Sequence, residues 1–258
     1  MCTLLIWKNR HHDFPLIIAA NRDEFEARPS SDPMRLVEKP LIIGGRDEVA
    51  GGTWLAVTGA GTIVGLTNRR AAGKHDPTKK SRGTLVLDLA RLGSPAAIEA
   101  AVRSLDYRAY NPFVLVAVDR TNGFAAAAGE DGMTITPIAD GVHAVTNWQI
   151  DDRRHAKARR ATELAEALDI DVPLPRLVER LHTLLSDHAI GESGEQDGGL
   201  CVHRPAEGFG TVSSAIIAIG KAGDVHFFYG RGHACESHIR DVSALLRPED
   251  SQRAAVEQ

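Results

Sequence analysis

The chain has 258 residues, of which 43% are hydrophobic and 25% are charged, and its formal net charge at pH 7 is −4. This is the composition of an ordinary globular protein, so an intrinsically disordered chain is excluded. Acidic residues outnumber basic ones, 34 to 30, which excludes a globally basic surface for nucleic acid. We therefore expect no nucleic-acid partner.

Cysteine usage and hydropathy indicate a reducing compartment. The chain holds three cysteines, Cys2, Cys201 and Cys235, and an odd number without a spacing pattern argues against a secreted disulfide framework. No apolar run reaches the roughly 18 residues of a membrane-spanning helix, and the apolar stretch after Met1 is too short for a signal peptide. We expect a cytoplasmic protein with no integral membrane segment, and the sequence leaves its oligomeric state open.

Short apolar runs between turn residues predict strands through much of the chain. The expected strands cover residues 3–7, 16–20, 53–57, 62–67, 113–118, 124–128, 133–138, 142–146, 212–219 and 225–229. Turn-forming sequences between neighbouring runs, such as Asp-Arg-Thr-Asn-Gly at 119–123, predict hairpins and therefore antiparallel pairing.

Two pairs of helices are expected between the strands. The first pair follows Ser81 and Ser94, with apolar stripes at Leu85, Leu89 and Leu92 and at Ile98, Val102 and Leu105. The second pair follows Asp152 and Pro175, with stripes at Ala161, Leu164 and Leu168 and at Leu177, Leu181 and Leu184. This order predicts an α+β fold with four layers, in which antiparallel sheets lie between outer helices. No repeat or linker divides the chain, so we expect a single domain over residues 1–258 with a frayed tail at about 248–258.

Cys2 is the most informative single residue. If Met1 is removed, Cys2 becomes the N-terminus and carries both a thiol and a free α-amine at the head of a buried strand. An α-amine has a pKa of roughly 7.7–8.0, so it can act as a base near neutral pH and activate the thiol as a nucleophile. The alternative is that Cys2 is a small apolar residue in an edge strand.

The run Asn21-Arg22-Asp23-Glu24 directly follows the second expected strand. An arginine and an aspartate at a strand end can orient a substrate group and hold a terminal amine. The alternative is a turn with a surface salt bridge.

Asparagines end two other expected strands. Asn68 follows the strand at 62–67, and Asn147 follows the strand at 142–146. In such a position a side-chain amide can donate its N–H to a developing oxyanion. Either asparagine can instead cap a turn.

Together these motifs resemble the NRDE family, which includes the transport-and-Golgi-organisation proteins. The matching segments follow one another through nearly the whole chain, at residues 1–2, 19–25, 28–30, 51–54, 66–68, 81–83, 110–113 and 208–214. The resemblance implies an N-terminal-nucleophile (Ntn) hydrolase-like fold, an αββα sandwich, in agreement with the order of elements.

A more distant resemblance to the choloylglycine and penicillin V acylases implies catalytic roles. In that pattern Cys2 is the nucleophile and its amine the base, Asp23 holds the amine, and Arg22 steers the nucleophile. Asn68 and Asn147 face the oxyanion and the substrate. The acylases also carry an arginine late in the chain, and the corresponding stretch here, residues 211–215, has none. The implied activity is hydrolysis of a non-peptide, linear C–N amide bond in a small molecule, with no required cofactor and no metal.

Asn21, Glu24 and Trp54, from the same motifs, are further candidate ligand contacts. The family also includes members linked to haem trafficking and to acyl-CoA or lipid handling, which implies an alternative without turnover: a carrier or chaperone for haem or acyl-CoA. A basic loop after Asn68, to which Arg69, Arg70 and Arg82 belong, can hold a phosphate or a propionate. The alternative for this loop is a solvated surface.

Two clusters carry weaker signals. The segment 233–238, with His233, Cys235 and His238, has the residue types of a metal site but no second ligand pair. His11 and His12 lie in an expected turn and can ligate haem axially, against the alternative of an exposed turn.

Overall fold

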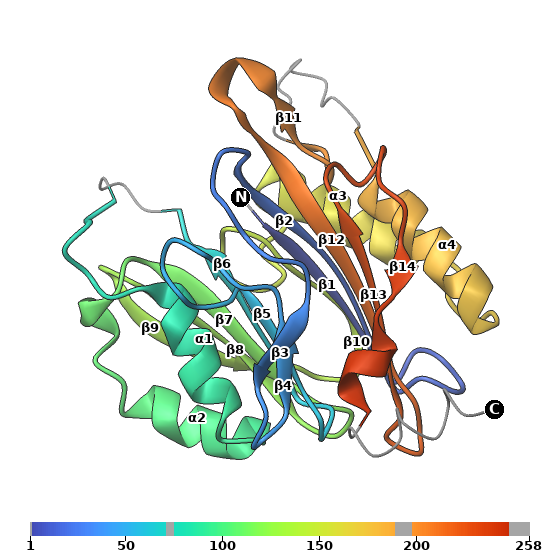
Figure 1. Cartoon of the computed structure of the whole chain (residues 1–258), viewed down its shortest axis with the longest axis horizontal. Helices are drawn as coiled ribbons and strands as arrows, with labels where there is room; N and C mark the ends of the chain where they lie inside the picture. The colour runs from blue at the N-terminus through green and yellow to red at the C-terminus, as the bar shows by residue number, and fades with distance from the viewer. Residues whose placement is uncertain (1, 71–74, 189–197, 248–258) are drawn as a thin grey trace.

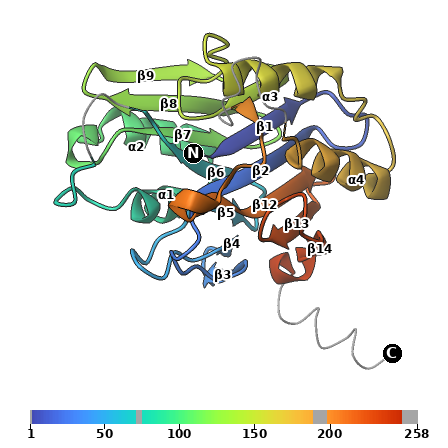
Figure 2. The ribbon, with the colours of Figure 1, turned by 90° about the horizontal axis from the view of Figure 1, so that it is seen from above.

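The computed structural model describes residues 2–70, 75–188 and 198–247. Within these residues the chain forms two antiparallel sheets that face each other, with a pair of helices on the outer side of each sheet (Figures 1 and 2). The expected four-layer αββα arrangement is thereby confirmed. The tail expected at about 248–258 lies outside the described residues.

The first sheet holds the N-terminal strand second from one edge. Its strands, in spatial order, are β10 (Gly141–Val145), β1 (Thr3–Lys8), β2 (Leu16–Phe25), β12 (Phe209–Ile219), β13 (Val225–Arg231) and β14 (Arg240–Asp241), and β11 (His203–Arg204) pairs with β12. Helices α3 (Ala156–Ala167) and α4 (Leu174–Leu185) cover its outer face.

The second sheet is a run of hairpins. Its strands follow chain order: β3 (Met34–Val37), β4 (Ile42–Gly44), β5 (Leu55–Thr58), β6 (Ile63–Asn68), β7 (Phe113–Val118), β8 (Gly123–Gly129) and β9 (Gly132–Pro137). Helices α1 (Arg82–Ala90) and α2 (Pro95–Arg103) cover its outer face. Among the described residues, short 3₁₀ turns lie at Tyr107–Ala109, Pro205–Glu207 and Ser243–Leu246.

Both faces of the central strands are buried, which explains their continuous apolar runs. In β1, Leu4 and Ile6 point between the sheets, whereas Leu5 and Trp7 point towards α3 and α4. Because side chains alternate along a strand, even-numbered residues of β1 and β2 face the other sheet and odd-numbered residues face the helices. This alternation decides where each polar residue of the candidate site points.

The structure corrects three expectations. Strand β2 continues to Phe25, so the Asn-Arg-Asp-Glu run is part of a strand and not a turn after it, because β12 pairs along its whole length. Strands β3 and β4 were not expected, since their runs are too short to stand out. Helix α1 ends at Ala90, and Leu92 lies outside it with 45% of its surface exposed.

The two serines that precede helices α1 and α2 differ in whether their side chains cap the helix. The Ser94 side chain accepts a hydrogen bond from the amide of Ala97 and caps α2, whereas Ser81 precedes α1 without a side-chain cap. Among the described residues, no helix has the length and apolar character needed to cross a membrane.

Candidate functional site

Cys2 stands at the head of β1, between the strands β10 and β2 that flank it. Its side chain is half-buried, and its thiol lies 3.9 Å from the backbone oxygen of Asp23. Cys2 lines both a small inner cavity of about 20 Å³ and an outer groove of about 550 Å³. The thiol therefore sits where the two spaces meet.

The inner cavity lies between the ends of the two sheets. It is lined by Cys2, Thr3, Leu4, Ala20, Asn21, Arg22, Trp54, Leu55, Leu66, Thr67, Ser213 and Ala215. Most of its wall is aliphatic or aromatic, with a few polar groups near Cys2. Such a lining suits an apolar group whose polar end reaches the thiol.

Arg22 brings a positive charge to this cavity. Its position in β2 directs its side chain between the sheets, where only 5% of the residue is exposed. Its guanidinium donates to the hydroxyl of Ser30 at 3.1 Å and stacks 4.1 Å from the ring centroid of Trp54. Glu24 lies 3.8 Å away, so the charge is only loosely paired. The stacking fixes the arginine, and cation–π contacts of this kind stabilise a desolvated guanidinium.

Asp23 points the other way, towards the helices. One carboxylate oxygen lies 2.8 Å from the ammonium of Lys157 in α3, and the other accepts the hydroxyl of Thr211 at 2.7 Å. The Asp23 side chain has no exposed surface, and that of Lys157 has 8%. The carboxylate is thus held in a buried ion pair, and the contact of Asp23 with the thiol is through its backbone oxygen.

Asn21 shares that helix-facing side of β2. Its amide donates to the backbone oxygens of Leu185 at 2.8 Å and Leu200 at 2.9 Å, and its side-chain oxygen accepts the hydroxyl of Ser214 at 2.7 Å. The amide N–H groups thereby hold the end of α4 and the segment before β11 against the sheet, and the side-chain oxygen bonds to the neighbouring strand β12. The residue also borders the inner cavity.

The two asparagines meet where β6 and β10 end. The amide of Asn147 donates to the backbone oxygen of Asn68 at 2.6 Å, and the backbone oxygen of Asn147 accepts from the amide of Arg70 at 2.9 Å. The hydroxyl of Thr67 donates to the backbone oxygen of Thr146 beside them. Asn68 lines the outer groove with Cys2, whereas Asn147 is buried and joins the two sheets.

Charged side chains of both signs border the outer groove. Its lining includes Arg28, His75, Lys79, Lys80 and Arg82 on the basic side and Glu24 and Asp47 on the acidic side, together with Asn68, Asn111 and the start of α1. The guanidinium of Arg28 forks onto Asp47 at 3.1 and 2.8 Å. Burial acts to raise the pKa of Asp47, but the hydrogen bonds from Arg28 and from backbone amides outweigh it and hold that pKa below its usual value.

Arg82 borders the groove at the first turn of α1. It donates to the backbone oxygen of Pro112 at 2.9 Å. Burial lowers the pKa of Arg82, and the nearby Cys2 and Glu24 oppose this shift by favouring its charge. An arginine stays protonated in proteins, so the groove carries a second, half-buried positive charge.

Arg69 and Arg70 take other positions. Arg69 forks onto Asp131 at 2.6 and 2.8 Å, and this hydrogen-bonded pair raises the pKa of Arg69. Neither arginine is among the residues that line the inner cavity or the outer groove in the described structure. The ligand contacts expected for Arg69 and Arg70 therefore stay a prediction, because neither residue borders these two spaces.

Sequence reasoning missed Lys157. It belongs to a basic helix start that reads as a solvated face, yet only 7% of it is exposed. The signal was its spacing: Lys157 lies four residues before Ala161, which faces the core, so both share one side of α3. Thr211, Arg28 and Asn111 were also missed.

The comparisons with known proteins agree with this description. The model of the family "Transport and Golgi organisation 2" matches residues 1–231. The human Transport and Golgi organization protein 2 homolog is 28% identical over 241 residues, which cover 83% of this chain and 85% of that protein.

Two structures of variants of conjugated bile acid hydrolase from Clostridium perfringens are similar in fold. Their TM-scores are 0.57 and 0.52, each at 11% identity, and each comparison covers 96% of this chain and 95% of the other. The fold is thus Ntn-hydrolase-like, and the family match covers most of the chain. The chain belongs to the Transport and Golgi organisation 2 family.

Proposed function

We propose that the protein is an N-terminal-cysteine amidohydrolase that cleaves a small linear amide carrying an anionic group. One observation carries the proposal: the Cys2 thiol lies where a small, mainly apolar cavity meets a groove that Arg22, Arg28 and Arg82 border. In this scheme the carbonyl end of the acyl group lies beside Cys2 at the mouth of the small cavity, and the groove receives the rest of the substrate. The Clostridium hydrolase, which has the same fold, is named for its action on conjugated bile acids.

The reaction begins with attack of the thiolate on the amide carbonyl carbon. A C–S bond forms, and the electron pair of the carbonyl π bond moves to the oxygen. Collapse of this oxyanion breaks the C–N bond, and the amine leaves with the proton that the thiol lost. Water then attacks the thioester, releases the acid and restores the thiol. The chemistry needs no cofactor.

The surrounding side chains have separate roles in this scheme. After removal of Met1, the α-amine of Cys2 accepts the thiol proton. Arg22 and Arg82 bring positive charge to the spaces that Cys2 borders. The amide of Asn68 donates to the oxyanion, and Asn147 positions Asn68 by holding its backbone oxygen.

Intact-mass measurement and hydrolysis assays test this proposal. We expect the native protein to lack Met1 and to hydrolyse N-acyl amino acids, and we expect Cys2→Ala to abolish turnover. Asn68→Ala should lower kcat by about 100- to 1000-fold with little change in substrate affinity. Asn122→Ala, at an exposed turn residue outside both spaces, is the matched control for Asn68→Ala. A retained Met1 together with no hydrolysis of the acyl-amide panel contradicts the proposal.

A second candidate function is a carrier for haem or acyl-CoA. It is favoured by the size of the outer groove and by Lys79, Lys80 and Arg82 on its border, which suit phosphate or propionate groups. Charge reversal at Lys79 and Lys80 should weaken binding of an acyl-CoA, and added salt should weaken it further. Charge reversal at Arg69, which is paired with Asp131, is the matched control. Acyl-CoA affinity that is unchanged both by charge reversal at Lys79 and Lys80 and by added salt contradicts the carrier hypothesis.

The carrier and the hydrolase make different demands on Cys2. A carrier should bind its ligand equally well after Cys2→Ala, and it should release the ligand unchanged. The cytoplasmic location expected from cysteine usage suits either function, because a reducing compartment keeps the thiol free.

A further inference from the structure

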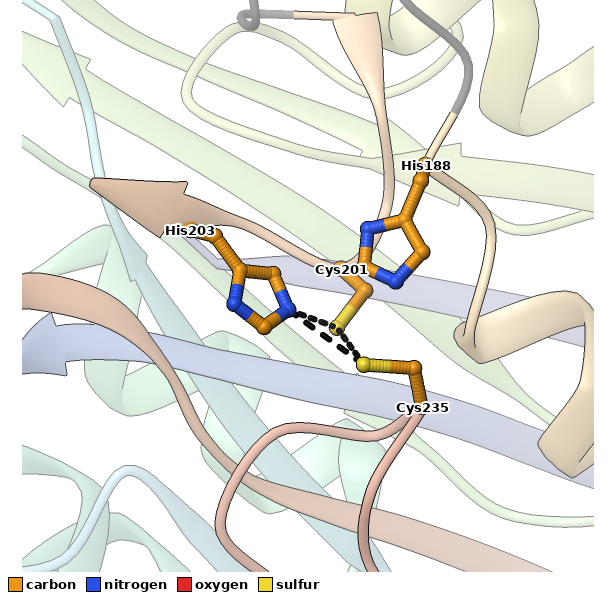
Figure 3. Close-up of side chains that lie close together, drawn as sticks. All are labelled: His188, Cys201, His203 and Cys235. Carbon is orange, nitrogen blue, oxygen red and sulfur yellow. Dashed lines mark hydrogen bonds between the residues drawn. The ribbon is translucent and has the colours of Figure 1, made fainter. Parts of the chain in front are cut away.

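Four metal-binding side chains converge on the helix side of the first sheet, away from Cys2. They are His188 just after α4, Cys201 and His203 at the start of β11, and Cys235 between β13 and β14 (Figure 3). One ligand atom from each residue lies within 4.8 Å of all the others. Three segments distant in sequence therefore bring two imidazoles and two thiols to one point.

The distances within the cluster match the edges of a coordination tetrahedron. The nearer ring nitrogen of His203, Nε2, lies 3.5 Å from the sulfur of Cys201 and 3.3 Å from that of Cys235, and the two sulfurs lie 3.9 Å apart. Zinc bonds of about 2.3 Å to sulfur and about 2.0 Å to nitrogen give tetrahedral edges of about 3.8 Å between sulfurs and about 3.5 Å between sulfur and nitrogen. Three ligands thus need almost no movement to share one ion.

The surrounding fold holds these ligands in place. The amide of Cys201 donates to the backbone oxygen of Asp187 at 2.9 Å, which ties β11 to the residue before His188. Cys201 and His203 are two residues apart in an extended segment, so their side chains share one side. The ring of His233 packs on His203 with 3.9 Å between centroids. Gly210 permits this approach, because a Cβ there would lie 2.9 Å from the His233 ring.

A disulfide is the competing reading of the two thiols. Its S–S bond is about 2.05 Å long, and it gives no reason for two imidazoles to gather around the sulfurs. Two sulfurs and two nitrogens in a tetrahedral arrangement are instead a typical donor set for zinc. Of the segment 233–238, singled out in the sequence, only Cys235 belongs to this cluster.

We propose that His188, Cys201, His203 and Cys235 form a structural Zn²⁺ site. On binding, each thiol releases its proton to solvent and coordinates as a thiolate, and each imidazole coordinates as the neutral ring. All four positions are taken by protein ligands, which is the pattern of a structural rather than a catalytic zinc.

The site also connects to the buried ion pair of Asp23. Val202, between Cys201 and His203, donates its amide to the hydroxyl of Thr211, which in turn donates to Asp23. Zinc would hold this segment against β12 and thereby fix one partner of the Asp23 carboxylate. We expect metal loading to raise Tm by several degrees.

Cobalt(II) binding to the metal-free chain tests the proposal. We expect one equivalent of Co²⁺ to bind, with visible absorption of tetrahedral intensity and near-ultraviolet bands from sulfur-to-cobalt charge transfer, and one equivalent of Zn²⁺ to displace it. Cys235→Ser, at an exposed position, should weaken zinc binding by at least about 100-fold without unfolding the chain. His203→Gln should do the same, and Cys2→Ser and His238→Gln are matched controls that should leave affinity unchanged.

Three results would overturn the site. The first is cobalt bound without sulfur charge-transfer bands. The second is zinc affinity equal in Cys235→Ser and the parent chain, with the ion then held elsewhere, for example by His11, His12 and Asp171. The third is a Cys201–Cys235 disulfide, found by mass spectrometry in protein purified under reducing conditions and alkylated without further reduction.

Discussion

The buried pair between Asp23 and Lys157 offers a sharp test of the structure. Replacing Lys157 with Met keeps the length of the side chain and removes its charge. The carboxylate of Asp23, which has no exposed surface, then loses the ammonium at 2.8 Å and keeps the hydroxyl of Thr211. If Asp23 faces the helices, this change should lower the free energy of unfolding strongly. If Asp23 instead pointed between the sheets, the change should have little effect on stability.

The magnitude follows from burial. At an effective dielectric constant of about 20, unit charges 2.8 Å apart attract by about 6 kcal/mol. Desolvation of both groups offsets much of this, but removing only one partner leaves a buried charge without compensation. Such changes cost about 3–5 kcal/mol of unfolding free energy, or roughly 6–20 °C in Tm for a chain of this size.

Urea and thermal denaturation at pH 7 measure this effect. Asp23→Asn alone should also destabilise the chain, because it leaves the buried ammonium of Lys157 unpaired. The double variant Asp23→Asn/Lys157→Met should recover much of the loss, since replacing both partners of a buried pair is often close to neutral. Arg176→Met is the matched control: its pair with Glu179 is 64% exposed on both sides, and its loss should cost under about 1 kcal/mol.

Two outcomes would refute the reasoning. One is a Lys157→Met variant whose free energy of unfolding lies within about 1 kcal/mol of that of the parent chain. The other is a double variant whose loss equals the sum of the two single losses, which would mean that the two residues do not interact.

Three further predictions rest on other contacts. The hydrogen bond to Asp151 raises the pKa of His143, so this pair should stabilise the chain fully below the ordinary histidine pKa of about 6.5 and lose that effect as pH rises through the raised pKa. The difference in unfolding free energy between the parent chain and His143→Gln should therefore narrow from pH 6 to 9. A difference that stays constant over this range would contradict the prediction. Asn21→Leu removes a buried amide that donates to two backbone oxygens and accepts one hydroxyl, so denaturation should show a loss of about 2–4 kcal/mol, and a loss under 1 kcal/mol would mean that water replaces these contacts. Gly52→Ala places a Cβ 2.1 Å from the backbone carbon of Gly83, so it should cost at least about 1–3 kcal/mol and disturb α1 in hydrogen exchange; unchanged protection of α1 would argue against this close contact.

Much of the fold could be predicted from the sequence because its central strands are buried on both faces. Continuous apolar runs such as residues 113–118 identify strands without any tertiary information. The polar end of β2 could not be found in this way, since Asn21–Phe25 is extended only because β12 pairs with it. Pairing partners nearly 200 residues away leave no local pattern.

Which of the candidate residues lie near Cys2 was predictable only in part. Cys2 and Arg22 share the inner cavity, as their positions near strand ends suggested. The direction of Asn68 was not predictable, because it depends on which face of β6 meets the other sheet: Thr67 takes the inward position, and Asn68 shares only the outer groove with Cys2. The sequence did not predict the full cluster around Cys235 for a similar reason, since its other residues come from two other parts of the chain.

Because side chains alternate along β2, two residues of its four-residue polar motif act mainly in folding and the other two act mainly at the site. Asn21 and Asp23 bind the helix layer, and Arg22 and Glu24 border the spaces next to Cys2. Randomising positions 22 and 24 should therefore yield libraries that stay folded while their ligand preference changes. Randomising positions 21 and 23 should mostly yield aggregated protein, whatever ligand is used for selection.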